Sequence, residues 1–174
     1  MEKDKKDDIR TGYPDCCFSV NDNWFRLRTG AIIIEDNSLL LVKNAKSPNY
    51  YSVGGGVHMN EKAEDCVIRE VREETGVDYQ VDHLAVICEN FFKEAALGYD
   101  PLHCHVIEFY YLMKSRGKKD AKCNTYGWNN EKEEISWIPL NQLAQTDVKP
   151  EFLRHRIKEI LEGKSLIHIV NDER

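Results

Sequence analysis

The order of apolar and polar residues along the chain predicts strands, then a helix, then further strands and a second helix. Nearly continuous apolar runs at 31–34 and 39–42 flank a polar turn at Asp36 and Asn37. Two such runs joined by Asx residues predict a β-hairpin whose strands are covered on both faces. The segment SPNYYSV (47–53) predicts a further short strand.

Two segments have the apolar spacing of an amphipathic helix. The first spans 62–75, with Asn60 as its predicted N-cap and Gly76 as its C-cap. The second begins at Pro150 and ends at Gly163. Its apolar positions are Leu153, Ile157, Ile160 and Leu161.

Between and after these helices the pattern predicts strands again. They are HLAVICENFF (83–92), HCHVIEFYYLM (103–113), EEISWIPL (133–140) and SLIHIV (165–170), with one helical turn at LNQLA (140–144). Polar loops are predicted at 93–102 and 114–130, and long loops in compact domains often carry function. This order predicts a mixed α/β fold with a sheet between helices.

No internal repeat or linker divides the chain, so residues 21–174 are predicted to form a single domain. Residues 1–20 show little periodicity and are interpreted as an N-terminal extension. The first ten of these residues are mostly charged and are expected to fray.

Composition narrows the classes of function. Hydrophobic residues make up 41% and charged residues 31% of the 174 residues, which favours one packed domain over a disordered chain. The net charge of −6 lacks the basic excess typical of proteins that bind duplex nucleic acid, so duplex binding is not expected. A polyanionic substrate would then need local attraction, and a bound metal ion would provide it.

Cysteine usage and hydropathy bear on the compartment. The six cysteines include no C-x-x-C pair, and the HCH triplet at 103–105 is better explained by alternation along a strand than by metal ligation. No apolar run reaches about 18 residues, and the charged N-terminus does not look like a signal peptide. We therefore expect a cytoplasmic protein with reduced thiols and no membrane partner.

The helix predicted at 62–75 carries its acids in an unusual place. Glu70 and Glu74 stack at a spacing of four residues, and Glu73 lies beside Glu70. All three share a side with the apolar stripe instead of opposing it. Carboxylates so placed repel one another and lose hydration, and a hard divalent cation would offset both costs. The stripe consists of Ala63, Cys66, Val67 and Val71.

Two neighbouring features leave this interpretation open. Lys62, Arg69 and Arg72 could instead neutralise the acids in surface ion pairs. Three glycines at 54–56 precede the helix. Such a run more often forms a turn, but it also lets a backbone carbonyl approach a bound ion.

A motif joins these features. Its fixed positions are Gly55, Glu61, Arg69, Glu70, Val71, Glu73, Glu74, Gly76 and Val77. This pattern resembles the Nudix box, G-x5-E-x7-R-E-U-x-E-E-x-G-U with U aliphatic, and every specified position is filled. The predicted strand order over about 24–162 also resembles the Nudix fold. The resemblance implies an α/β/α sandwich with a mixed β-sheet between helices.

The resemblance also implies roles for the matched residues. Those that resemble ligands of Mg²⁺ or Mn²⁺ are Gly54, through its carbonyl, Glu70, Glu73 and Glu74. Glu61 resembles the acid that ties the loop to the helix, with Gly55 as a further supporting residue. Arg69 resembles the residue that orients a catalytic glutamate. The general base differs among family members, and we predict Glu70, followed by Glu73.

Some family members use a glutamate outside the box as the base. The candidates here are Glu89, Glu94, Glu108 and Glu134. Glu108 ranks first because an acid is unusual inside the apolar run VIEFYY, although an outward-facing strand residue is the simpler explanation and is favoured over a base.

Four residues are candidates for binding the substrate: Arg26, Arg28, Phe91 and Glu108. The two arginines share one face of their predicted strand, where they either line a solvated edge or reach an anionic ligand. Trp24 or Phe25 would be near enough to stack on a base. Phe91 offers another stacking surface, unless it packs in the core.

The implied reaction is metal-dependent hydrolysis of a diphosphate linkage in a nucleoside diphosphate joined to another moiety, with water attacking phosphorus. The window FFKEA (91–95) lacks both the proline that would resemble ADP-ribose pyrophosphatases and the tyrosine that would resemble diadenosine polyphosphate hydrolases. The substrate therefore stays open within nucleotide-type small molecules. A ligand-sensing Nudix module without turnover and an interaction domain are the alternatives. Homodimers are common in the family, and the sequence does not decide between monomer and dimer.

Overall fold

The computed structural model describes residues 13–45, 48–94, 102–123, 132–163 and 165–174. The strands are β1 (Cys17–Val20), β2 (Asn23–Ile32), β3 (Ile34–Glu35), β4 (Ser38–Asn44), β5 (Tyr50–Tyr51), β6 (Val81–Glu94), β7 (Leu102–Met113), β8 (Glu133–Pro139), β9 (Val148–Lys149) and β10 (Ile167–Asp172). The helices are α1 (Ala63–Thr75), α2 (Phe152–His155), α3 (Ile157–Glu162) and a 3-10 helix η1 (Leu140–Gln145).

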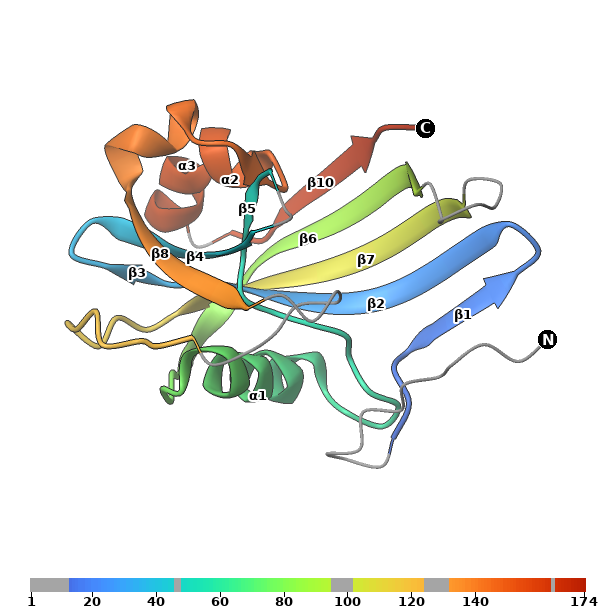
Figure 1. The fold of residues 1–174 in the computed structure, drawn as a ribbon, viewed down its shortest axis with the longest axis horizontal. Coiled ribbons are helices and arrows are strands. Elements are labelled where there is room, and N and C mark those ends of the chain that lie inside the picture. Colours follow the sequence, from blue (N-terminus) through green and yellow to red (C-terminus); the bar gives the residue numbers. More distant parts are fainter. Residues whose placement is uncertain (1–12, 46–47, 95–101, 124–131, 164) are drawn as a thin grey trace.

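The strands form two mixed sheets. One has the order β1-β2-β7-β6-β10, and the other has the order β3-β4-β5-β9 with β8 beside β4. Parallel pairs are β2 with β7, β6 with β10 and β5 with β9, and the other pairs are antiparallel. Figure 1 shows α1 on one side of the first sheet and α2 with α3 on the other. The predicted fold class is confirmed, and the second sheet is an addition to it.

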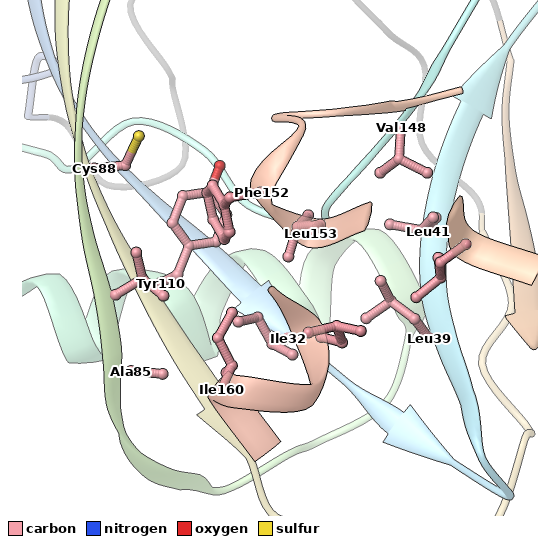
Figure 2. Packing of buried hydrophobic residues seen from close by; sticks show 13 residues of the cluster. Ile32, Leu39, Leu41, Ala85, Cys88, Tyr110, Val148, Phe152, Leu153 and Ile160 are labelled. Carbon is pink, nitrogen blue, oxygen red and sulfur yellow. The ribbon is translucent and has the colours of Figure 1, made fainter. Parts of the chain in front are cut away.

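Alternate residues of β2 and β7 face the two cores, as the period of a strand requires. Ile32 and Tyr110 pack in the core that α2 and α3 cover. Ala31 and Tyr111 pack in the core that α1 covers. Figure 2 shows the first core, in which the rings of Tyr110 and Phe152 pack edge to face with their centroids 4.9 Å apart. The near-continuous apolar runs of the sequence are therefore strands buried on both faces.

The predicted hairpin is confirmed. Asp36 and Asn37 have φ angles of 43° and 57°, and Glu35 pairs with Ser38 across this two-residue turn. Left-handed conformations at both turn positions match the twist of the flanking strands, and Asp and Asn tolerate them.

The first helix begins later than predicted, and its predicted cap is wrong. The N-cap is Lys62, without a side-chain hydrogen bond, and Gly76 at φ 68° is the C-cap as predicted. Asn60 instead has φ 67° in a turn in which the Glu61 N–H donates to the carbonyl of His58. Asparagine tolerates this left-handed conformation. An N-cap residue needs extended backbone angles instead, so Asn60 does not cap the helix.

The second predicted helix is divided into α2 and α3. Arg156 separates them with φ −115° and ψ 5°, outside the helical range, and Gly163 follows α3 as predicted. Arginine is a good helix former, so no residue type in the sequence marks this break. The turn predicted at 140–144 is the 3-10 helix η1.

Several elements extend beyond or fall outside the predictions. Strands β1 and β9 were not predicted, and β6 continues to Glu94, into the segment predicted as a loop. The remainder of that loop (95–101), residues 124–130 of the next one, and the first ten residues lie outside the described residues. The predicted fraying and the domain boundary at residue 20 therefore stay predictions.

Two expectations about chemistry can be compared with the structure. The described residues include all six cysteines, and none of them is in a disulfide bond. His103 is exposed, Cys104 is buried and His105 is half-buried, as alternation along a strand predicts.

Among the helices of the described residues, none is long and apolar enough to span a bilayer.

Glu35, in the β3–β4 hairpin, is hydrogen-bonded to the segment that follows β7. Its side chain is buried and accepts hydrogen bonds from the Ser115 hydroxyl (2.7 Å) and from the N–H groups of Arg116 (2.7 Å) and Gly117 (2.8 Å). Burial alone would raise the pKa of this carboxyl, but these bonds and one from Tyr79 lower it overall. These residues, 115–117, belong to the connection between β7 and β8.

Replacing Glu35 with glutamine should lower the free energy of unfolding by about 2 kcal/mol at pH 7, because buried donors lose their acceptor. The folded-state pKa is lowered, so the wild-type advantage is present above the unfolded pKa of about 4.3 and disappears as the pH falls through the folded value. Urea unfolding at neutral and acid pH measures both effects. Asp36→Asn removes the neighbouring, exposed charge and is the matched control; equal losses in the two variants would contradict the role of Glu35.

Candidate active site

The glycine segment 54–56 runs alongside β2. The Thr29 N–H donates to the carbonyl of Gly55 at 2.9 Å, and the Val57 N–H donates to the carbonyl of Leu27 at 3.1 Å. The segment is thereby fixed on the side of β2 away from β7. The loop of the box is thus hydrogen-bonded to the edge of β2 before the chain enters α1.

Gly55 is required by the approach of a carboxylate. A Cβ atom at this position would overlap the carboxyl group of Glu70. Only glycine lets Glu70 lie directly against the loop. The loop and the helix therefore meet at the residue predicted to be the general base.

Arg69, on α1, contacts three acids, one in the loop and two on the helix. Its Nε and Nη2 atoms contact the two carboxylate oxygens of Glu61 at 2.8 and 3.0 Å, while its Nη1 atom lies 2.7 Å from Glu70 and 3.5 Å from Glu73. Glu61 also accepts a hydrogen bond from the N–H of His58 at 2.9 Å. This bidentate ion pair fits the predicted tie between loop and helix and the predicted orientation of Glu70 by Arg69.

The ion-pair alternative from the sequence holds only in part. Arg69 pairs with two of the acids, as that alternative requires. Arg72 instead lies 3.5 Å from Asp78 on the exposed surface. Lys62 is exposed at the start of the helix.

The two stacked acids lie in an environment that disfavours their charge. Burial raises the pKa of Glu70, although Arg69 opposes the change. Burial, followed by the charges of Glu70 and Glu133, raises the pKa of Glu74 well above its ordinary value, even though the N–H of Gly54 lowers it. Ionising both carboxyl groups is therefore costly without a nearby counter-charge.

These residues fit a hard divalent cation such as Mg²⁺ or Mn²⁺. The available donors are all oxygen atoms: the carboxylates of Glu70, Glu73 and Glu74 and the carbonyl of Gly54. In the described part of the chain, no group of three or more His, Cys, Asp or Glu side chains is close enough to hold an ion as it stands. Arg69 holds two of the three glutamates, so a cation would have to compete with its guanidinium for them.

Sequence reasoning missed Glu133, at the start of β8. Its charge contributes to the raised pKa of Glu74, and the Tyr51 hydroxyl donates to its Oε1 atom at 2.7 Å. The predicted Glu134 is exposed. Strand alternation was the available signal, because Glu133 shares a face with Ile135, which packs in the core that α1 covers.

Glu108 is buried, with 6% of its surface exposed, so the alternative of an outward-facing residue is wrong. It lies opposite Arg28 in the β2–β7 register, with 3.7 Å between Nη1 and Oε1. Burial raises the pKa of Glu108, against the opposing charge of Arg28. The Nη2 atom of Arg28 is also 3.4 Å from the carbonyl of Gly54. Arg28 thus links Glu108 to the glycine loop.

Arg26 lies on the same face of β2 as Arg28, and its Nη2 atom is 2.7 Å from Asp15. The Nε atoms of both arginines are buried and have no hydrogen-bond partner among the described residues. Phe91 is not part of this group. It pairs with His105 in the register of β6 and β7, and its ring stacks on that of His105 at 4.3 Å.

The other acids proposed from the sequence are also separate. Glu89 contacts His168 at 2.7 Å, and Glu94 is exposed at the end of β6. Glu89 and Phe91 lie two residues apart on the face of the sheet opposite Glu108. The structure therefore brings together the box acids, Arg26, Arg28 and Glu108, and leaves out Glu89, Glu94 and Phe91.

Comparison with known proteins agrees with the predicted family. The family model described as NUDIX domain matches residues 24–160, and the chain belongs to the NUDIX family. A MutT-like protein of Streptomyces ambofaciens is 36% identical over 61 residues, which cover 35% of this chain and 40% of that protein. This chain thus matches less than half the length of that relative.

Solved structures share the fold. The MutT protein of Methanosarcina mazei Go1 is similar with a TM-score of 0.58 and 21% identity, over 81% of this chain and 96% of that one. An ADP-ribose pyrophosphatase of Streptococcus suis 89-1591 is similar with a TM-score of 0.55 and 16% identity, over 84% of this chain and 98% of that one. Membership of the predicted family is therefore confirmed, and the substrate is open.

Replacing Glu74 with glutamine should weaken Mn²⁺ binding at least about tenfold, because a lost ligand costs no less than a lost outer-shell partner. The same change should raise the Tm of the metal-free protein by about 2–4 °C. Folding raises the pKa of Glu74, so its ionised form opposes folding at neutral pH and a neutral amide removes that opposition.

Isothermal titration and thermal unfolding measure these two effects. Glu64→Gln is the matched control, since Glu64 is an exposed acid of the same helix. Equal Mn²⁺ affinity in the wild type and Glu74→Gln would show that the ion does not bind here.

Proposed function

We propose that this protein is a divalent-metal-dependent pyrophosphohydrolase. It cleaves the diphosphate linkage of a nucleoside diphosphate joined to another moiety, by attack of water on phosphorus. The observation that carries the proposal is the pair Glu70 and Glu74, two partly buried acids with raised pKa values next to the glycine loop. Such a pair costs stability in a purely structural helix, whereas a bound divalent cation would offset that cost.

Glu70, Glu73 and Glu74, with the carbonyl of Gly54, are proposed to hold Mg²⁺ or Mn²⁺. When bound, the ion neutralises phosphate oxygens and favours ionisation of a water molecule. Arg69 keeps the carboxylate of Glu70 at a fixed position through its contact at 2.7 Å. The arginine is in turn fixed by its two contacts to Glu61.

We assign the general base to Glu70, with Glu73 as the second candidate. Burial raises the pKa of Glu70 against the opposing charge of Arg69, which contacts its Oε1 atom, and a raised pKa makes a carboxylate a stronger base. Glu73 is the more exposed of the two, with 23% of its side chain accessible against 14% for Glu70. The less exposed Glu70 is therefore the first assignment.

Arg28 and Arg26 are proposed to bind the phosphates of the substrate. Both have a buried Nε donor without a partner among the described residues, and the guanidinium group suits bidentate contacts to phosphate. Glu108 is then a partner that orients Arg28 and is not a base, since it is buried against that arginine. These local cations would help an acidic protein of net charge −6 to bind an anionic substrate.

The identity of the substrate stays at the level of its chemical class. The similar structures carry the names MutT protein and ADP-ribose pyrophosphatase, and at 21% and 16% identity they support the fold alone. Phe91 is on the other face of the sheet from Arg28, so base stacking on Phe91 is not part of the proposal. A cytoplasmic location and a homodimer stay predictions.

Incubation with Mg²⁺ and a library of nucleoside diphosphate derivatives should release a mononucleotide from at least one member, and EDTA should abolish the release. Coupling to a phosphatase and a phosphate assay detects the product. No release from any member by a protein that binds Mn²⁺ would favour a ligand-sensing module without turnover. Absence of Mn²⁺ binding as well would favour an interaction domain.

Replacing Glu133 with glutamine should lower kcat about tenfold to a hundredfold, because the carboxylate beside Glu74 belongs to the shell of partners around the proposed metal ligands. Glu134→Gln is the matched control, one residue further along β8 and exposed. Steady-state rates on the substrate found in the library compare the two variants. Equal rates for wild type and Glu133→Gln would remove Glu133 from the site.

A further inference from the structure

The segment just before β1 contacts the loop of the box, although it precedes the family match at 24–160. The Cys16 N–H donates to the carbonyl of Val57 at 2.7 Å, and Asp15 and His58 form an isolated antiparallel bridge. Here the loop is hydrogen-bonded both to β2 and to this segment. A stretch interpreted from the sequence as an extension is thus an edge partner of the candidate site.

The side chain of Asp15 is directed into this contact. Its Oδ2 atom lies 2.7 Å from Nη2 of Arg26, and its Oδ1 atom lies 3.6 Å from Nε2 of His58, whose side chain is only 3% exposed. A Cβ atom at Gly56 would overlap the Asp15 carboxylate. The third glycine of the run therefore accommodates this aspartate, just as Gly55 accommodates Glu70.

Two routes lead from Asp15 to the acids of α1. Through side chains, the Nδ1 atom of His58 lies 3.6 Å from Glu61, which forms the bidentate pair with Arg69. Through the backbone, the carbonyl of Gly56 accepts a hydrogen bond from Nη2 of Arg69 at 3.3 Å. Arg69 is the residue that contacts Glu70, so both routes end at the same carboxylate.

We propose that Asp15 is a positioning residue for the active site: it fixes Gly56 and His58 so that Glu61 and Arg69 hold Glu70 in place. This inference rests on the proposed function, because its effect on rate requires a reaction at Glu70. Asp15 touches none of the proposed metal ligands and acts only through other residues.

The charge of Asp15 neutralises the guanidinium group of Arg26. The Arg26 side chain is 21% exposed, and its Nε atom is already without a partner among the described residues. Loss of the Asp15 charge would leave a partly buried guanidinium unpaired beside Gly56, and such a group reorients to find another acid. The glycine loop would then lose the contact that defines its outer side.

The test compares Asp15→Asn with Asp22→Asn, an exposed acid of the same region whose Oδ2 atom lies 3.7 Å from His103. In Asp15→Asn we expect Mn²⁺ affinity and kcat to fall about tenfold, in the range seen for outer-shell partners of metal sites. Amide hydrogen exchange of residues 54–61 in the metal-free protein should become faster. Asp22→Asn should match the wild type in all three measurements.

The outcomes separate this inference from the proposed function. Unchanged exchange at 54–61 in Asp15→Asn overturns the positioning role, whatever the activity. A lower Tm with unchanged Mn²⁺ affinity and unchanged kcat also overturns it, because Asp15 would then only stabilise the fold. A wild type that binds no Mn²⁺ and hydrolyses no substrate overturns the proposed function, and the exchange data still report whether Asp15 orders the loop.

Discussion

The ion pair between Arg69 and Glu61 is the interaction on which the candidate site depends. It is bidentate, half-buried, and joins a loop residue to a helix residue eight positions later. The same guanidinium contacts Glu70 and Glu73, so the position of two predicted ligands follows from how the loop holds Glu61. The glycines at 55 and 56 serve the same end, because each leaves room for a carboxylate against the loop. Loop, helix and β2 are thereby held as one unit.

This unit buries two acids, Glu70 and Glu74, in surroundings that disfavour their ionised forms. Burial raises the pKa of Glu70, and burial with neighbouring charges raises that of Glu74, so the acids are costly to ionise in the metal-free protein. Elsewhere the fold treats a buried acid differently: Glu35 receives donors from three residues after β7, and its pKa is lowered. The contrast between Glu35, whose carboxylate is fully hydrogen-bonded, and the pair Glu70 and Glu74 supports the proposal that this pair is functional.

Much of this could be predicted from the sequence, because the signals are local. The hairpin at Asp36, the C-cap at Gly76 and the acids aligned with the apolar stripe all follow from spacing. What could not be predicted depends on contacts between distant segments. Strand β1 was missed because residues 17–20 are exposed and lack a buried face. Glu133 and Asp15 acquire their significance only when β8 and the segment before β1 pack beside the box.

The central claim is that Glu70 and Glu74, held by the loop and Arg69, form a divalent-metal site. The most direct test is a crystal structure of the protein with Mn²⁺, in which anomalous scattering locates the ion. The account predicts a peak in contact with the carboxylates of Glu70 and Glu74 and close to the Gly54 carbonyl. Mn²⁺ bound elsewhere, with Glu70 still paired only to Arg69, would contradict it.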